Sequence, residues 1–531
     1  APTTPIQKEL SIIWKEVLGL EQVGITDNFF RIRGDSILSI QVSSRIRQLG
    51  YPCQVKDIFT YPTIEKLSDY LEHSNSTVSI DTEQDTLDGE VKLLPIQRWF
   101  TDQVDQGLLP QSGHWNQSFM IRVPILELEK LQNVVVELLE YHDALRMYYN
   151  IEDRWKQFYS SSIATPKISC LDVNTYNTIE INKILTDWQS TFDLEKGPLF
   201  HMGYLHGYAD GSARIYIAAH HIVIDAVSWR ILTIDLKQLY SGESLPLKGS
   251  SYRQWTDVIH QYPTLYPKEA SFWSSQLDGI TTDWSSKKLY HNSTYDNFYL
   301  DKLTTEYLLQ DASMAYHTQI NDLLLTALGY ALQQLNGEAT QGITLEGHGR
   351  EHISDTIDHS RTVGWFTAMF PIKFTITEDI GISICEVKER LRGIPNNGVG
   401  FGAFALDSAT NYSYDDLPEV IFNYLGQFDT DTQDSNWQIT SEISGQQIAS
   451  ENTSSAVITI NGGITAGVLG FNITTRLGTK KTKELSAYFK IHLMKVISHC
   501  KENLSLHGSR NTPSDFTTVE IDQSLLNQLE L

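Results

Sequence analysis

The sequence predicts an α+β protein in which a small helical bundle is followed by a much larger domain of mixed helices and strands. Three observations support this fold class. The chain has 531 residues, which is more than one ordinary domain holds. Apolar residues recur at helical spacing within residues 1–75. Beyond residue 90, helical and strand-like patterns alternate almost to the end of the chain.

Composition divides the chain further. Residues 76–90 have few apolar side chains and several carboxylates, which is typical of a solvated linker. The length of the mixed domain suggests two lobes, 91–266 and 267–505. We place the division there because Pro263 and Pro267 lie close together and interrupt regular structure.

The two ends of the chain indicate a piece of a longer protein. The chain starts at Ala1 and not at Met, and residues 506–531 form an open tail that we expect to lead into a further domain. The sequence has no signal peptide and no run of 18 apolar residues, so we expect a cytoplasmic protein without membrane contact.

Charge and cysteine usage exclude further classes. The net charge of −24 argues against nucleic-acid binding, because phosphates would be repelled. The four cysteines lie far apart without metal-ligand spacing, so we expect reduced thiols and no metal site. They are Cys53, Cys170, Cys385 and Cys500.

The small domain shows three helical stretches. Residues 6–20 carry apolar side chains at helical spacing and end near Gly19, and residues 64–71 predict another helix. A helix beginning at Ser36 would leave this serine exposed at its N-terminus. Taken alone, Asp35 or Ser36 can simply cap that helix.

Two adjacent histidines follow a predicted buried strand over residues 213–219. His221 shares a face with that strand's core residues and His220 points the other way. We expect the next helix to begin near Ser228, which places His221 beside a helix N-terminus, where a base suits proton transfer near developing negative charge. A packed core histidine is the simpler alternative. A zinc site is less favoured because a third ligand is missing, although Asp225 follows closely.

The second lobe offers a carboxylate and two polar groups at strand ends. A helix over 321–334 precedes a short strand in which Glu346 faces away from the apolar side chains, followed by glycines typical of an exposed turn. Arg350 can neutralise Glu346 if that carboxylate is only a surface group. Asn423 and Tyr424 lie at another strand end.

Two further stretches of this lobe are less informative. The glycine run 395–402 lacks the Gly-Lys-Ser/Thr ending of a phosphate loop, so nucleotide binding is rejected. Residues 427–456 are polar and predict a loop that spans between the lobes, and the last helix is expected over 485–500.

Residues 1–75 resemble the peptidyl carrier proteins of nonribosomal peptide synthetases. The resemblance rests on Asp27-Asn28-Phe29-Phe30 and Gly34-Asp35-Ser36-Ile37. It implies that Ser36 carries a 4′-phosphopantetheine arm whose thiol holds an aminoacyl or peptidyl thioester. Ile32-Arg33-Gly34 departs from the usual Leu-Gly-Gly, and the Asp before Ser36 resembles carriers that feed an epimerization domain.

Residues 93–505 resemble the epimerization domains of the same synthetases through seven motifs in family order. These are Pro95–Phe100, His220–Trp229, Asp322–Ala327, Glu346–Glu351, Arg361–Thr367, Pro395–Gly402 and Phe422–Gly426. The fourth and seventh motifs distinguish epimerization from condensation domains, which share the His-His motif. The resemblance implies a chloramphenicol-acetyltransferase-like fold, with two lobes in a V and an active site in a tunnel between them.

The resemblance also implies the chemistry, which is inversion of Cα in a carrier-bound aminoacyl or peptidyl thioester. It assigns the two acid/base groups to His221 and Glu346, with Asn423 and Tyr424 orienting the thioester or the amine. The helix beginning near Ser228 would stabilise the developing negative charge. We expect neither pyridoxal phosphate, for which no motif offers a Schiff-base lysine, nor a metal.

Buried charge prompts one further expectation. Asp225 at a strand-turn-helix junction requires neutralisation, and we assign this to Arg146 in His142-Asp143-Ala144-Leu145-Arg146. Ala226 stands where the family commonly has Gly, a departure from which we expect little consequence.

The family context names partners and leaves two alternatives. We expect the carrier to dock to its epimerization domain in cis, with an upstream adenylation domain, a downstream condensation domain and a phosphopantetheinyl transferase as further partners. A condensation-type acyltransferase of the same fold is one alternative. A catalytically silent docking module is the other, and it is disfavoured because His221 and Glu346 are both present.

Overall fold

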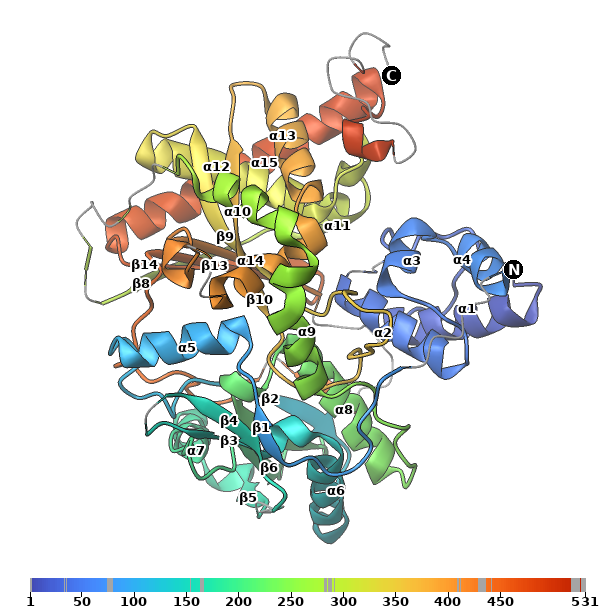
Figure 1. Ribbon diagram of the computed structural model, residues 1–531, viewed down its shortest axis with the longest axis vertical. Helices are drawn as coiled ribbons and strands as arrows, with labels where there is room; N and C mark the ends of the chain where they lie inside the picture. The colour runs from blue at the N-terminus through green and yellow to red at the C-terminus, as the bar shows by residue number, and fades with distance from the viewer. Residues whose placement is uncertain are drawn as a thin grey trace.

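The computed structural model describes residues 2–516 and residue 526, except 33, 35, 74–79, 153, 163–166, 281–283, 285–288, 291, 408–409, 411, 428–435 and 441. A small helical domain lies beside a two-lobed body, and the two lobes are stacked along the long axis of the molecule (Figure 1). The α+β class, with a carrier-like bundle in front, is thereby confirmed.

The N-terminal residues form the small bundle. Its helices are α1 (Pro5–Leu18), α2 (Ser36–Gln48), α3 (Val55–Thr60) and α4 (Ile64–His73). Thr4 caps α1 through a bond from the Gln7 N–H, and Gly19 ends it with φ of 65°, a backbone angle that favours glycine. Trp14 and Phe29 meet at 4.9 Å in a core separate from that of the larger body. The helices expected over 6–20 and 64–71 are confirmed.

The first lobe is a five-stranded sheet with helices packed against it. Its elements are β1 (Gly89–Val91), α5 (Pro95–Asp105), β2 (Asn116–Val123), α6 (Leu128–Tyr141), β3 (Met147–Asn150), β4 (Lys156–Tyr159), β5 (Ser169–Asp172), α7 (Thr178–Gln189), β6 (Phe200–His206), β7 (Ala213–His220), α8 (Ala226–Tyr240) and α9 (Tyr252–Leu265). The strand order is β12-β2-β7-β6-β5, in which β12 (Gln438–Thr440) comes from a later part of the chain. Strands β1, β4 and β3 form a small separate sheet. Every residue of the central strand β7 is buried, as its apolar run predicts.

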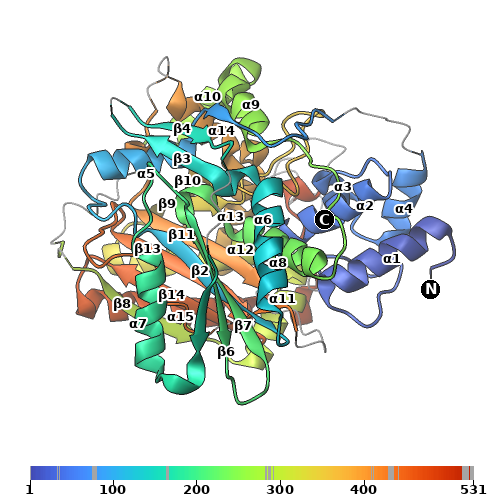
Figure 2. The ribbon, with the colours of Figure 1, turned by 90° about the horizontal axis from the view of Figure 1, so that it is seen from below.

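The second lobe contains a six-stranded mixed sheet. Its elements are α10 (Ala270–Leu277), β8 (Thr294–Tyr299), α11 (Lys302–Gln310), α12 (Ile320–Asn336), β9 (Thr340–Gly347), β10 (Ala368–Thr375), α13 (Ile380–Arg392), α14 (Val399–Leu406), β11 (Val420–Gln427), β13 (Ile458–Thr465), β14 (Val468–Thr475) and α15 (Thr479–His507). The order is β10-β9-β11-β13-β14-β8. Helix α15 packs on one face of this sheet through Phe489, whose ring lies 4.8 Å from that of Phe471. Figure 2 shows the sheet behind the strands of the first lobe.

Several boundaries differ from the sequence predictions. Helix α8 begins at Ala226 and not near Ser228, because the Asp225 carboxylate caps it by accepting the Ser228 N–H at 2.7 Å. Pro263 does not interrupt regular structure, since it lies in the last turn of α9, where its missing N–H removes only a single helical bond. Helix α15 is longer than the expected 485–500. The sequence prediction missed its additional turns because they are polar and show no helical spacing of apolar residues.

The expected linker is only partly solvated. Residues 74–79 lie outside the described part of the chain, but the stretch from residue 80 is held on the first lobe. Glu83 pairs with Arg253 at 2.5 Å, and the Gln84 amide exchanges two bonds with the Lys248 backbone. The first lobe therefore binds the side chains of Glu83 and Gln84, which the low apolar content of the segment does not reveal.

The polar segment 427–456 crosses from the second lobe to the first. It includes strand β12, which pairs antiparallel with β2 at the edge of the first-lobe sheet. The predicted crossing is thus present, with a short strand inside the predicted loop. Among the residues that the structure describes, no helix is long and apolar enough to cross a membrane.

Candidate active site

The two adjacent histidines have different environments. His220 ends strand β7 with no exposed surface, and its Nε2 bonds the Ser112 carbonyl at 2.7 Å while its Nδ1 accepts the Ile222 N–H at 3.2 Å. Burial lowers the pKa of His220 to about 3. A neutral imidazole with both nitrogens bonded to backbone is structural, so His220 supports the site by fixing the strand end.

His221 begins the turn that follows β7, and its tautomer can be read from its neighbours. The Trp229 indole N–H can only donate, and it lies 2.6 Å from Gln117 Oε1. The Gln117 amide nitrogen therefore faces His221 Nε2, at 2.8 Å, and donates to it. On the other side, His221 Nδ1 lies 2.9 Å from the Ile224 carbonyl, which can only accept. His221 is held as the neutral Nδ1–H tautomer, with an unprotonated Nε2.

Two tryptophans enclose the His221 ring. Trp115 stacks on it with ring centroids 4.8 Å apart, and Trp365 of the second lobe lies 4.7 Å away. This packing removes water, so burial lowers the pKa of His221 below its usual value and favours the uncharged base. Sequence reasoning missed Gln117 and Trp115. Gln117 lies in β2 and Trp115 directly precedes that strand. Only the pairing of β2 with β7 brings these two residues to the histidine.

Asp225 is neutralised by Arg350 and not by Arg146. Arg350 Nη2 lies 3.0 and 3.1 Å from the two Asp225 oxygens, and it also bonds Ser228 Oγ at 3.0 Å. The Phe366 N–H donates to the same carboxylate at 3.1 Å. The Arg350 side chain has no exposed surface, so this is a buried ion pair between the lobes.

The predicted role of Arg146 is wrong. Its guanidinium pairs with Asp143, three residues earlier, and donates to the carbonyls of Leu139 at 2.8 Å and Ser160 at 2.5 Å. A short-range carboxylate and nearby carbonyls therefore satisfy this arginine inside the first lobe. The expected use of Arg350 to neutralise Glu346 is wrong for the same reason, because Arg350 is committed to Asp225.

Gly349 allows the chain to place Arg350 of the second lobe against Asp225 of the first lobe. Its φ is +66°, and a Cβ placed there would lie 1.7 Å from the Phe366 carbonyl oxygen. No other residue fits such a close approach between two chain segments. The glycine therefore lets the chain turn after β9 and direct Arg350 toward the first lobe.

Glu346 lies near the end of β9 in the second-lobe sheet. Parallel pairing of β9 with β11 sets Phe422 beside Leu345, and thus Asn423 beside Glu346. The Asn423 amide donates to Glu346 Oε2 at 2.8 Å. Burial raises the pKa of Glu346 to about 7, so at neutral pH the carboxyl is close to half protonated. Tyr424, on the same strand, is half-buried against the core.

Two links hold the His221 and Glu346 segments together. Arg350 follows Glu346 by four positions and bonds Asp225, which follows His221 by four positions. The chain that places Trp365 on His221 continues into β10, whose first residue pairs with Gly347. The segments that contain His221 and Glu346 are therefore joined in two ways: by the buried Arg350–Asp225 ion pair, and by the chain that runs from Trp365 into β10.

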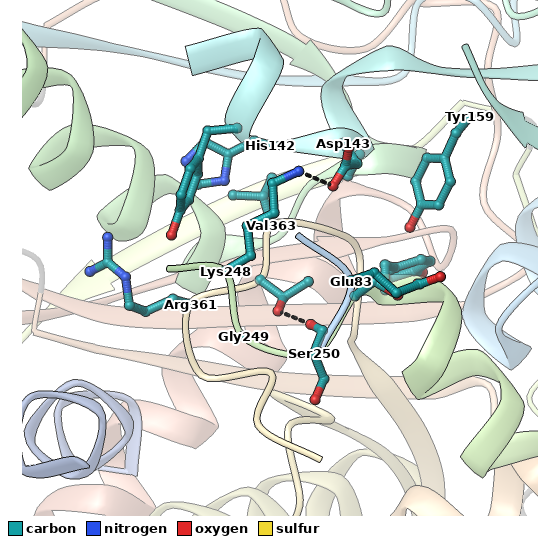
Figure 3. Close-up of a pocket in the computed structure, with 14 residues that line it drawn as sticks. Glu83, His142, Asp143, Tyr159, Lys248, Gly249, Ser250, Arg361 and Val363 are labelled. Atoms are coloured by element: carbon teal, nitrogen blue, oxygen red, sulfur yellow. Dashed lines mark hydrogen bonds and ion pairs between the residues drawn. The ribbon is translucent and has the colours of Figure 1, made fainter. Parts of the chain in front are cut away.

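A second cluster of charged residues joins the lobes nearby without reaching His221. It surrounds a cavity of about 30 Å³, room for roughly one water molecule (Figure 3). Buried Asp235 lies 3.0 Å from His142 Nε2 and also pairs with Arg361 of the second lobe. On the other side of the cavity Lys248 bonds Asp143 at 2.9 Å. Every charge there has a partner, so the cluster serves as a joint.

The loop that contains these arginines also contacts the small domain. Arg47 on α2 makes two bonds to the Asp358 carboxylate, at 2.8 and 3.0 Å, and the Gln54 amide lies 3.5 Å from Asp355. Helix α2 begins at Ser36, as predicted, so the serine lies at the N-terminus of a 13-residue helix. Asp35, its alternative as a cap, lies outside the described residues.

A helix N-terminus carries the positive end of the helix dipole, which suits a phosphate group. The first turn of α2 contains no acidic residue that would repel one. The described residues thus fit a phosphodiester at Ser36. Within the same described part of the chain, no three His, Cys, Asp or Glu side chains form a group that could hold a metal ion.

Along the chain a helical bundle comes first, and a two-lobed domain with a buried histidine follows it. Two family models match the chain in that order. A phosphopantetheine attachment site matches residues 8–71, and a condensation domain matches residues 88–520. The chain therefore belongs to the condensation domain family and has a phosphopantetheine attachment domain in front, the arrangement found in nonribosomal peptide synthetases.

Similar proteins agree with this assignment. Surfactin synthase subunit 2 of Bacillus subtilis (strain 168) is 34% identical over 555 residues, and gramicidin S synthase 1 of Brevibacillus brevis is 35% identical over 572 residues. The alignments cover 100% and 98% of this chain, but only 15% and 50% of those proteins. The chain thus spans at most half the length of these two relatives.

Solved structures show the same two-lobed fold. The epimerization domain from the third module of tyrocidine synthetase B is 31% identical, with a TM-score of 0.72 over 80% of this chain and 100% of its own. The first condensation domain of the calcium-dependent antibiotic synthetase is 16% identical with a TM-score of 0.58, which supports the fold alone. The covalent cofactor implied by the attachment domain is 4′-phosphopantetheine.

Proposed function

We propose that the chain is a carrier–epimerase pair that inverts the Cα configuration of an aminoacyl or peptidyl thioester held on the pantetheine of Ser36. The observation that supports this most is the pairing of two buried groups of opposite protonation preference. His221 is a neutral base whose unprotonated Nε2 accepts a hydrogen bond from Gln117, and Glu346 is a carboxyl with a pKa of about 7. Inversion needs one group to remove the Cα proton and another to return one from the opposite side.

When bound, pantetheine supplies a thioester, which acidifies the neighbouring Cα–H. Burial favours the uncharged form of both groups, so neutral His221 with protonated Glu346 is a populated form of the pair at neutral pH. In one direction His221 Nε2 takes the proton while Glu346 gives one, and the charges that develop are opposite in sign. In the other direction the roles exchange. Each inversion leaves one proton on the pair, moved from Glu346 to His221. Before the same inversion can repeat, His221 must release its proton to solvent and Glu346 must take one up.

The neighbouring residues prepare this exchange. The Gln117 amide holds Nε2 of His221 unprotonated, and Asn423 orients the Glu346 carboxyl, so both are proposed as positioning residues. The N-terminus of α8, fixed by Asp225 and Ser228, is proposed to stabilise negative charge on the substrate. Tyr424 is proposed to orient the thioester or the amine.

The domain divisions and partners are part of the proposal. We assign 1–75 to the carrier, 76–90 to the linker, 91–266 and 267–505 to the two lobes, and 506–531 to a tail leading onward. The Arg47–Asp358 contact supports docking of the carrier in cis. An adenylation domain would load the carrier, a condensation domain would use its product, and a phosphopantetheinyl transferase would modify Ser36.

The carrier assignment is tested by mass. Incubation with coenzyme A and a phosphopantetheinyl transferase is expected to add one phosphopantetheine to the chain, and Ser36→Ala is expected to add none. Thr60→Ala, an exposed hydroxyl on another helix of the bundle, is the matched control. Labelling of the Ser36→Ala protein would overturn the site.

The reaction is tested by chirality. Carriers loaded from a panel of L-aminoacyl and peptidyl coenzyme A thioesters are hydrolysed after incubation, and the released residue is resolved by chiral chromatography. A mixture of L and D forms supports epimerization. A new amide formed only when a second loaded carrier is added would instead identify a condensation enzyme. Full retention of the L form across the panel, without amide formation, would indicate a silent docking module.

A further inference from the structure

A row of polar side chains crosses the second-lobe sheet at the level of Glu346. Asn423 lies beside Glu346, and strand register then pairs Asn423 with Asn461, Asn461 with Asn472, and Asn472 with Asn297. Because neighbouring strands lie about 4.8 Å apart, the row runs roughly 14 Å from Asn423 to the edge strand β8. The last three, Asn461, Asn472 and Asn297, are called the distal asparagines below.

The distal asparagines lie on the open face of the sheet. Their strand neighbours Ile460, Phe471 and Phe298 are buried on the other face, where α15 packs, and side chains alternate along a strand. All three distal asparagines are exposed. Asparagine is depleted in strands, because its amide competes with the backbone. Four asparagines in register on four adjacent strands therefore call for a function.

The surroundings of the row form a shallow strip. Beside it on the same face, Gly463 pairs with Gly470, so no side chain rises there. The Tyr299 ring covers Gly470, since a Cβ at that glycine would lie 2.7 Å from the ring. On the other side of the row stands Tyr295, which is 81% exposed. The amides are thus flanked by two tyrosines, which combine apolar surface with a polar tip.

The row leads away from the carrier. In both ribbon views the carrier helices lie on one side of the molecule and strands β14 and β8 lie on the opposite side (Figures 1 and 2). A thioester that entered from the side of the carrier would reach Glu346 with its carbonyl end toward the carrier. A group attached to the nitrogen of the thioester-bound residue would then extend away from the carrier, toward the distal asparagines.

We propose that the distal asparagines bind the backbone of a peptide attached to the nitrogen of the residue being inverted. Asparagine amides both donate and accept, as peptide groups do, and they carry no charge that would select particular side chains. A strip of about 14 Å matches roughly four extended residues. An aminoacyl group ends at its amine and has nothing to place there. The inference rests on the proposed epimerization, and it names a peptidyl thioester as the preferred substrate.

The test compares thioesters that differ only in length. The whole chain is loaded with L-phenylalanyl, L-leucyl or L-valyl pantetheine, or with the same residues extended by four glycines at the nitrogen, enough to span the strip, and initial rates of Cα deuteration in D₂O are measured. The peptidyl forms are expected to react faster. Asn461→Ala combined with Asn472→Ala is expected to slow the peptidyl forms about tenfold, the loss of two modest hydrogen bonds, and to leave the aminoacyl forms unchanged.

A matched control and a binding arm complete the experiment. Thr474→Ala changes an exposed residue two positions along β14 on the same face, off the row, and is expected to have no effect. Equal slowing of aminoacyl and peptidyl forms, or no slowing, would overturn the peptide subsite. If the unaltered chain deuterates none of the thioesters, the proposed function fails. The subsite is then judged by calorimetry with an amide-linked Gly-Gly-Gly-Gly-Phe pantetheine, whose affinity the double variant must weaken about tenfold and the control must not.

Discussion

Gln117→Glu tests the tautomer assigned to His221. In the present structure the Gln117 amide nitrogen lies 2.8 Å from His221 Nε2 and requires that nitrogen to accept. A glutamate of the same shape keeps an oxygen for the Trp229 N–H, now at 2.6 Å, and places its second oxygen against Nε2. That oxygen can only accept. The substitution therefore reverses the bond and requires a proton on Nε2.

The expected size follows from the new charge. An opposite charge at hydrogen-bonding distance raises a histidine pKa by about 1–3 units, and each unit corresponds to about 1.4 kcal/mol in favour of the charged form. In the unaltered protein burial holds the pKa of His221 below its usual value, so the imidazole is neutral at pH 7. In the variant the imidazolium persists to a pH about 1–3 units higher, and base catalysis is lost below it.

The pH dependence of inversion provides the assay. The acidic limb of the rate profile is expected to move up by about 1–3 pH units in Gln117→Glu, and nitrogen NMR of labelled histidine is expected to show a doubly protonated ring near neutrality. Gln117→Leu removes the donor without adding charge, so it separates loss of the bond from its reversal. An unshifted acidic limb in Gln117→Glu, with a folded protein, would refute the assigned tautomer.

Three other substitutions probe different parts of the site. Arg350→Ala leaves the buried Asp225 carboxylate without its ion-pair partner, so it is expected to destabilise the fold by about 3–5 kcal/mol and lower the melting temperature. Arg390→Ala, at an exposed arginine on α13, is the control. Equal melting temperatures of the two variants would contradict the buried pair. Asn423→Leu removes a hydrogen-bond donor to the Glu346 carboxylate and is expected to raise the pKa of Glu346 above about 7. The basic limb of the rate profile, where Glu346 loses its proton, should therefore move to higher pH. A shift to lower pH would contradict the Asn423–Glu346 hydrogen bond. Arg47→Asp is expected to slow inversion of carrier-held substrate severalfold but not of free pantetheine thioesters, and Asp358→Arg in the same chain should restore the rate if the pair is a docking contact.

Local sequence signals predicted the parts of this protein that depend on short-range chemistry. The helical spacing of the bundle, the buried run of β7 and the strand end at Glu346 were all found in the expected places. A family resemblance through seven motifs added the two-lobed architecture. Each of these features is specified by residues close together in the chain.

The residues that were missed or misassigned act over long sequence separations. Arg350 was given to its near neighbour Glu346, and Arg146 to Asp225, because charge alone does not say which of several partners a fold brings within reach. The actual pair spans 125 positions and depends on a positive φ at Gly349. Gln117 belongs to a strand whose alternating pattern gives no sign that it will face a histidine 104 positions later.

The central claim is that His221 and Glu346 act on opposite faces of Cα, and deuterium exchange tests it most directly. L- and D-thioesters are incubated separately in D₂O with His221→Ala, Glu346→Gln and the double variant. Both single variants are expected to lose inversion, while one still exchanges deuterium into the L substrate and the other into the D substrate, because a lone base can remove and return a proton on its own side. The double variant should be little worse at inversion than either single one. Near-normal inversion by Glu346→Gln would mean that one base serves both faces, and the assignment would be wrong.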